Sequence, residues 1–127
     1  MTMPHVPILS PDQLPISLGT HLDGRSKTVV SDLINPHGFV VFRGYGVRSD
    51  QEFHDFIECF GLPNFTYAES FSNAVRRNRT PRVFTANEAP PEIEIFLHHE
   101  MAQTLVFPGQ LFFFCEQAPT VGGATPI

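Results

Sequence analysis

The pattern of hydrophobic and polar residues divides this chain into an irregular start, two helical segments and a series of extended segments. Prolines scattered among single apolar side chains forbid a helix at the start and predict an extended arm over residues 1–25. Across residues 26–35 the apolar side chains fall on one helical face, and Pro36 and Gly38 predict the end of that helix. We therefore expect the folded domain to occupy residues 26–127, with the arm lying over it.

A second helix is predicted by a capping box, in which Ser49 is followed three residues later by Glu52. The apolar residues after it recur at positions i, i+3, i+4 and i+7, so we expect them to be buried: Phe53, Phe56, Ile57 and Phe60. We expect the acidic residues of the same segment to be exposed: Asp50, Glu52 and Asp55. Gly61 and Pro63 predict where this helix ends.

Continuous apolar runs predict strands in the rest of the chain. Residues 39–42 (Phe-Val-Val-Phe) predict a short, fully buried strand, and Gly44 and Gly46 predict a turn after it. A long loop and three further strands are expected downstream: loop 64–81 and strands 82–85, 93–100 and 105–116. Helices followed by strands are typical of a sheet-based domain with helices packed outside.

Composition excludes several classes of protein. A hydrophobic fraction of 42% is that of a soluble globular protein, and no apolar run approaches the ~20 residues of a membrane span. The N-terminus lacks the pattern of a signal peptide, and Cys59 and Cys115 lie in apolar surroundings typical of buried thiols. We therefore expect a cytoplasmic protein with no membrane partner. The net charge of −5 argues against a nucleic-acid partner.

Positive charge is nevertheless concentrated in one place. Four of the eight Lys and Arg residues lie within one short segment: Arg76, Arg77, Arg79 and Arg82. Two interpretations stay open, a solvated loop, which we favour, and an anion-binding lip, because arginine pairs bidentately with carboxylates.

The candidate chemistry lies in the sequence Phe96-Leu97-His98-His99-Glu100-Met101. Side chains alternate sides along a strand, so His98 and Glu100 would share one face, with His99 packing on the other. A non-haem Fe(II) oxygenase holds its metal with two histidines and one carboxylate, and this pair would supply two of those ligands. The helical zinc motif His-Glu-x-x-His is excluded because Gln103 stands where the second histidine is needed.

Several motifs together resemble the taurine dioxygenase and clavaminate synthase-like family of Fe(II)/2-oxoglutarate-dependent oxygenases. They are Gly38-Phe39-Val40-Val41-Phe42-Arg43-Gly44, the block from Phe96 to Gln103, Leu111-Phe112-Phe113-Phe114-Cys115-Glu116 and Gly122-Gly123-Ala124-Thr125. The resemblance is strongest to the clavaminate synthase-like branch, where the ligand carboxylate is Glu. It covers only the N-terminal half of a family domain.

The resemblance implies a mainly β fold with flanking α-helices, a partial double-stranded β-helix (jelly roll) truncated before its C-terminal strands. It implies that His98 and Glu100 bind Fe(II), and that Thr125 helps to hold the carboxylate of the cosubstrate 2-oxoglutarate. The family's distal histidine and its arginine for the far carboxylate of 2-oxoglutarate have no counterpart in these 127 residues. We therefore expect this chain by itself to be inactive and poorly soluble.

The function implied by the resemblance is a dioxygenase that uses molecular oxygen to oxidise, usually by hydroxylation, a small-molecule substrate. The alternative is a jelly-roll binding or interaction protein that has the same fold without catalysis. The sequence leaves the substrate open.

Overall fold

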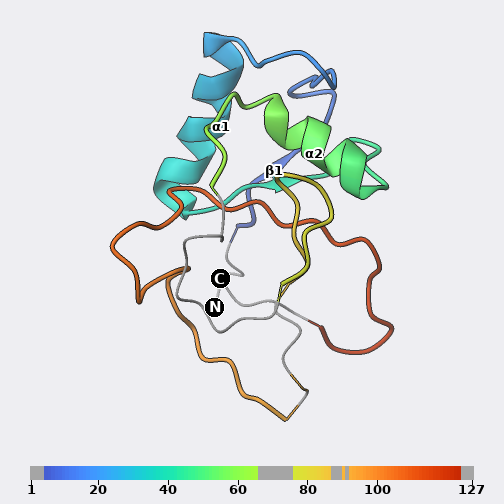
Figure 1. The fold of residues 1–127 in the computed structure, drawn as a ribbon. Coiled ribbons are helices and arrows are strands. Elements are labelled where there is room, and N and C mark those ends of the chain that lie inside the picture. The colour runs from blue at the N-terminus through green and yellow to red at the C-terminus, as the bar shows by residue number, and fades with distance from the viewer. Residues whose placement is uncertain (1–4, 66–75, 87–89, 91, 124–127) are drawn as a thin grey trace. The chain divides into compact units, whose positions relative to one another are not determined.

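The computed structural model describes residues 5–65, 76–86, 90 and 92–123. The chain divides into two compact units, Met1–Leu62 and Pro63–Ile127, which we describe separately. The first unit contains every helix and strand of the described residues (Figure 1), in the order β1 (Ile8–Leu9), α1 (Gly24–His37), β2 (Val41–Phe42) and α2 (Asp50–Glu58). Neither helix is long and apolar enough to cross a membrane.

Helix α1 confirms the first predicted helix and extends it at both ends. The Asp23 side chain caps its start by accepting a hydrogen bond of 2.7 Å from the Ser26 N–H. At its end Gly38 adopts a left-handed conformation (φ 78°) and donates its N–H to the Ile34 carbonyl. Pro36 lies inside the last turn. Pro36 does not end the helix, because a proline this near the end removes only its own backbone hydrogen bond. The helix ends at Gly38 instead.

Helix α2 confirms the predicted capping box. The Ser49 hydroxyl accepts from the Glu52 N–H at 3.2 Å, and the Glu52 carboxylate accepts from the Arg48 N–H at 2.8 Å. Three of the four apolar side chains expected in the core are buried, whereas Phe53 is only half-buried. The prediction that the acidic residues are exposed was wrong, since all three are half-buried: Asp50, Glu52 and Asp55. Carboxylates that fold back onto their own helix, as Glu52 does, lose exposure.

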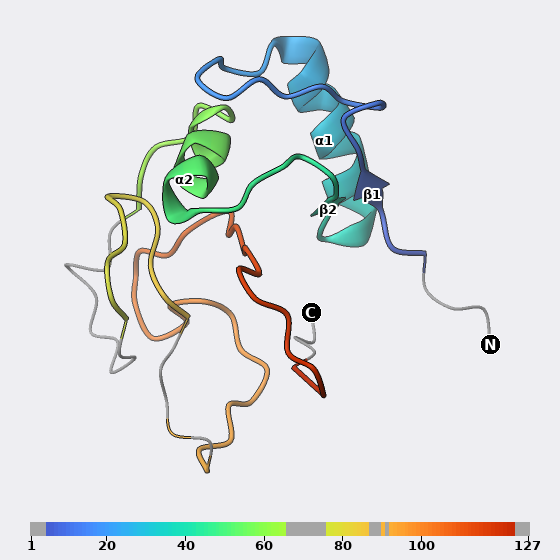
Figure 2. The same ribbon diagram turned by 90° about the vertical axis from the view of Figure 1, so that its right-hand side faces the viewer.

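Strands β1 and β2 form a two-stranded parallel sheet in which Ile8 pairs with Val41 and Leu9 with Phe42 (Figure 2). Parallel strands need a crossover connection, and α1 supplies it. The expected fully buried strand at residues 39–42 is shorter and only half-buried. A two-residue strand in a two-stranded sheet has too little neighbouring chain to cover it.

The buried interior of the first unit combines α2, β2 and the N-terminal residues. Phe42, Tyr45, Phe56 and Phe60 form an aromatic cluster, with ring centroids 5.3 to 5.7 Å apart for the contacting pairs. The N-terminal segment adds three buried side chains: Leu9, Leu14 and Leu22. It is tied down by hydrogen bonds of 2.7 Å from the Tyr45 hydroxyl to the Leu14 carbonyl and from the Leu22 N–H to the Cys59 carbonyl.

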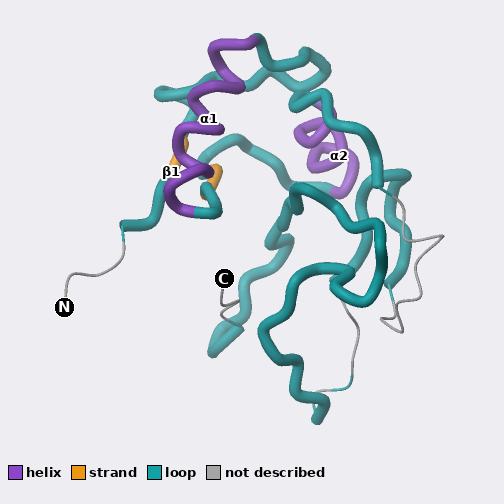
Figure 3. The backbone as a smooth tube through the Cα atoms, turned by 90° about the vertical axis from the view of Figure 1, so that its left-hand side faces the viewer, coloured by secondary structure: helices purple, strands orange, loops and turns teal. Residues whose placement is uncertain are grey.

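The described residues of the second unit form loops and turns (Figure 3). The expected strand at 82–85 is reduced to one antiparallel bridge between Asn78 and Phe84. The strands expected at 93–100 and 105–116 are absent from these described segments, because a strand requires a hydrogen-bonded neighbour. Residues 111–115 still alternate between exposed and half-buried side chains. The partial jelly roll stays a prediction, and the expected mainly β content is not found among the described residues.

Candidate metal centre

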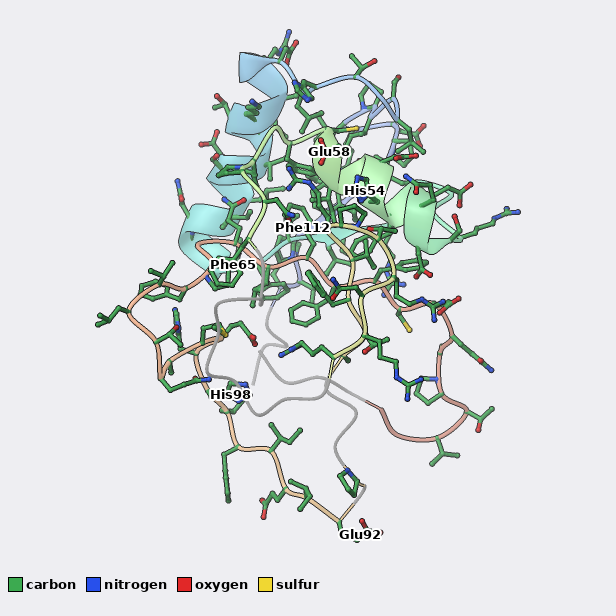
Figure 4. The ribbon with its side chains drawn as sticks, viewed as in Figure 1. His54, Glu58, Phe65, Glu92, His98 and Phe112 are labelled. Carbon is green, nitrogen blue, oxygen red and sulfur yellow. The ribbon has the colours of Figure 1, made fainter. Side chains whose placement is uncertain are left out.

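His98 lies in an irregular segment of the second unit (Figure 4) and is exposed. Its Nδ1 atom is 2.7 Å from the carbonyl oxygen of Phe96. A carbonyl oxygen can only accept a hydrogen bond, so this contact places a proton on Nδ1. Metal-binding histidines almost always donate their second ring N–H in this way. With Nδ1 donating to the carbonyl, Nε2 is the ring nitrogen that would coordinate a metal.

Glu100 is held by a residue far away in the sequence. Its Oε1 atom lies 3.1 Å from Nη2 of Arg76, and the Glu100 and Arg76 side chains are only 15% and 20% exposed. A carboxylate with so little contact with water needs a charged or hydrogen-bonding partner, and the guanidinium supplies it.

The backbone around Glu100 is a turn and not the expected strand. The Ala102 N–H donates to the His99 carbonyl at 3.1 Å. Met101 is buried and has a φ of 60°, a left-handed conformation that is uncommon for residues other than glycine. Thr104 closes the turn, because its N–H donates to the Met101 carbonyl at 2.9 Å. Its hydroxyl lies 2.9 Å from the same carbonyl and 2.6 Å from the Val106 carbonyl. The two-residue strand period that placed His98 and Glu100 on one face therefore does not apply here.

His99 has an aromatic neighbour of its own. Its ring lies 4.8 Å from the ring of Phe107, and the two planes are nearly perpendicular at 88°. Because His99 is exposed and no strand forms at this segment, its packing on the far side of a strand stays a prediction.

The arginine-rich segment forms a short hairpin around the Asn78–Phe84 bridge. Arg77 donates its N–H to the Thr85 hydroxyl at 3.0 Å and accepts from the Thr85 N–H at 2.9 Å. At the turn the Thr80 hydroxyl accepts from the N–H groups of Arg82 and Val83 at 3.2 and 3.0 Å. Sequence reasoning did not find the Arg76–Glu100 pair. Its one signal is the arginine cluster, which the sequence offered only as a solvated loop or an anion-binding lip.

The residues present fit a divalent metal in donor type, since His98 offers a neutral imidazole and Glu100 a carboxylate. Within the described residues there is no group of three or more His, Cys, Asp or Glu side chains that could hold a metal. Thr125 lies outside the described residues. The assignment of His98 and Glu100 as metal ligands and of Thr125 as a 2-oxoglutarate contact therefore stays a prediction.

Comparison with known proteins identifies the family. The family model described as "Taurine catabolism dioxygenase TauD, TfdA family" matches residues 6–127, and the chain belongs to this family. It is 43% identical over 114 residues to a clavaminate synthase-like protein of Arabidopsis thaliana, an alignment that covers 90% of this chain and 34% of that protein. It is 29% identical over 125 residues to the dapdiamide synthesis protein DdaC of Enterobacter agglomerans, covering 98% of this chain and 36% of that protein.

The chain thus spans about a third of the length of these curated relatives. No solved structure matches it significantly.

Proposed function

We propose that this chain belongs to an Fe(II)/2-oxoglutarate-dependent dioxygenase and supplies two of its iron ligands, His98 and Glu100. The observation that carries the proposal is the family match over residues 6–127, which includes the His98-x-Glu100 motif. The orientation of His98 supports it, because the contact from Nδ1 to the Phe96 carbonyl makes Nε2 the nitrogen that would bind a metal.

The proposed roles follow from the chemistry of each side chain. His98 binds the metal through Nε2, Glu100 binds it through its carboxylate, and Thr125 donates its hydroxyl to a carboxylate oxygen of 2-oxoglutarate. When bound, Fe(II) with 2-oxoglutarate and oxygen would supply the oxidising chemistry, and the protein would position a small-molecule substrate and exclude water. The fold that would carry these residues is the family's jelly roll.

The test is succinate formation by the full-length protein with Fe(II), ascorbate and 2-oxoglutarate under air, together with binding of Co(II), a stable substitute for Fe(II). We expect His98→Ala and Glu100→Ala to abolish succinate formation and to weaken Co(II) binding. His99→Ala is the matched control, because it removes a neighbouring imidazole that packs on Phe107. We expect it to retain both properties.

Two outcomes contradict the proposal. If His98→Ala binds Co(II) as tightly as the wild type, the metal site has been assigned to the wrong histidine. If the wild type binds Co(II) but forms no succinate from 2-oxoglutarate, the alternative of a binding protein without catalysis is favoured.

A further inference from the structure

The ion pair between Arg76 and Glu100 has no place in the roles proposed so far. We propose that Arg76 is a positioning residue, which holds the Glu100 carboxylate in the orientation needed to bind the metal. This inference rests on the proposed function, because it takes Glu100 as a metal ligand.

The environment of the pair gives the first argument. The Nη2–Oε1 distance is 3.1 Å, and both side chains are largely shielded from water. Exposed ion pairs contribute little because solvent screens them and long side chains stay mobile. Shielding on both sides makes this contact one that restricts the Glu100 side chain.

The backbone beneath Arg76 is fixed by the hairpin. The next residue, Arg77, exchanges two hydrogen bonds with Thr85, and Thr80 fixes the turn between them. A guanidinium that projects from such an anchored backbone loses less conformational entropy when it binds a carboxylate.

The backbone beneath Glu100 is fixed in the same way by the turn that follows it. Met101 is buried with a positive φ, and the Thr104 N–H donates to its carbonyl at 2.9 Å. Non-glycine residues keep such a conformation only where their surroundings enforce it. Both ends of the Arg76–Glu100 contact therefore start from defined backbone positions, which is what orientation of a metal ligand requires.

A positioning role and a charge role predict opposite signs for metal affinity. Removing a positive charge near the site would, by charge alone, strengthen the binding of a divalent cation. Removing the hydrogen bond that orients a ligand carboxylate weakens binding, typically 10- to 100-fold. A weaker affinity after removal of Arg76 therefore cannot come from its charge.

The experiment is a Co(II) titration of the full-length protein, followed by the visible absorption of the bound ion. We expect Arg76→Met, which removes both donor and charge at similar length, to weaken binding by about 10- to 100-fold. Arg76→Lys keeps the charge and one donor group but not the planar guanidinium, so its affinity should fall between those of Arg76→Met and the wild type. Arg77→Met makes the same charge change at the adjacent residue, and we expect its affinity to stay within about twofold of the wild type.

An unchanged or stronger affinity of Arg76→Met would overturn the proposal, and so would an equal loss in Arg77→Met. If Arg76→Met does not fold, the Co(II) affinity of Arg76→Lys tests the proposal in its place. A Co(II) affinity of Arg76→Lys about threefold or more below that of the wild type supports the positioning role, and an affinity equal to the wild type overturns it. Glu100→Gln separates this proposal from the proposed function. If that variant binds Co(II) like the wild type, Glu100 is not a ligand and the proposed metal site is wrong.

Discussion

The aromatic cluster of the first unit gives the most direct test of the fold. Phe56 is 5% exposed and lies at the centre of the cluster. Its ring centroid is 5.3 Å from that of Phe42, 5.5 Å from that of Tyr45 and 5.6 Å from that of Phe60. Phe56 and Phe42 each contact all three other rings, so replacing Phe56 by Ala removes three of the five aromatic contacts of the cluster.

Truncating a fully buried phenylalanine lowers the free energy of unfolding by about 3–5 kcal/mol in total, which includes the cavity left behind. Aromatic contacts, each worth roughly 0.5–1.5 kcal/mol beyond the buried area, decide where in that range a given phenylalanine falls. Because Phe56 takes part in three pairs and α2 is short, we expect a loss in the upper half of the 3–5 kcal/mol range.

The assay is urea denaturation followed by far-UV circular dichroism at low protein concentration, since the chain has no Trp to serve as a fluorescent probe. Phe53→Ala on the same helix is the matched control. Its side chain is only half-buried, so the loss should be clearly smaller. A loss under ~1 kcal/mol for Phe56→Ala would refute the packing of α2 described here.

Three further predictions concern pH and association. The hydrogen bond from the Ser26 N–H holds the pKa of Asp23 below its ordinary 3.8. The charged cap therefore stabilises α1 fully above pH 3.8, and this stabilisation is lost as the pH falls through the lowered pKa. Asp23→Asn should remove this part of the acid dependence of the melting temperature. Burial raises the pKa of the Tyr45 hydroxyl above 10.0. The neutral hydroxyl therefore contributes its full stabilisation of the fold below pH 10.0, and that contribution is lost as the pH rises through the raised pKa. Tyr45→Phe should abolish that alkaline loss and cost about 0.5–1.5 kcal/mol at neutral pH, measured by denaturation. The second unit exposes large apolar side chains, with Leu105 101% and Phe113 76% exposed, so the 127-residue chain by itself should associate; a monomeric mass by light scattering would contradict this.

The two helices could be predicted because their signals are local. Each cap lies within three or four residues of the groups it satisfies, as Ser49 and Glu52 show. Gly38 ends α1 by its own left-handed conformation. The spacing of Phe56, Ile57 and Phe60 identified the buried face of α2, while the half-burial of Asp50 and Phe53 depends on contacts that periodicity does not contain.

The pairing of the strands could not be predicted, because an apolar run such as residues 39–42, which contains β2, does not specify its hydrogen-bonding partner. Residues 111–115 keep the alternating exposure of a strand, yet they have no ladder among the described residues. The short β1 strand was missed for the converse reason. Two apolar residues, Ile8 and Leu9, are too short a run to predict a strand. They form one only by pairing with β2, whose residues lie 33 positions further along the sequence.

The candidate site shows how far a short motif determines geometry. The motif identifies the donor types at His98 and Glu100, but the two side chains are oriented by contacts of different range. His98 is oriented by the carbonyl of Phe96, two residues away in the same segment. Glu100 is oriented by Arg76, 24 residues away, which no spacing within the motif predicts. A change at Arg76 should therefore alter the carboxylate and leave the tautomer of His98 as it is.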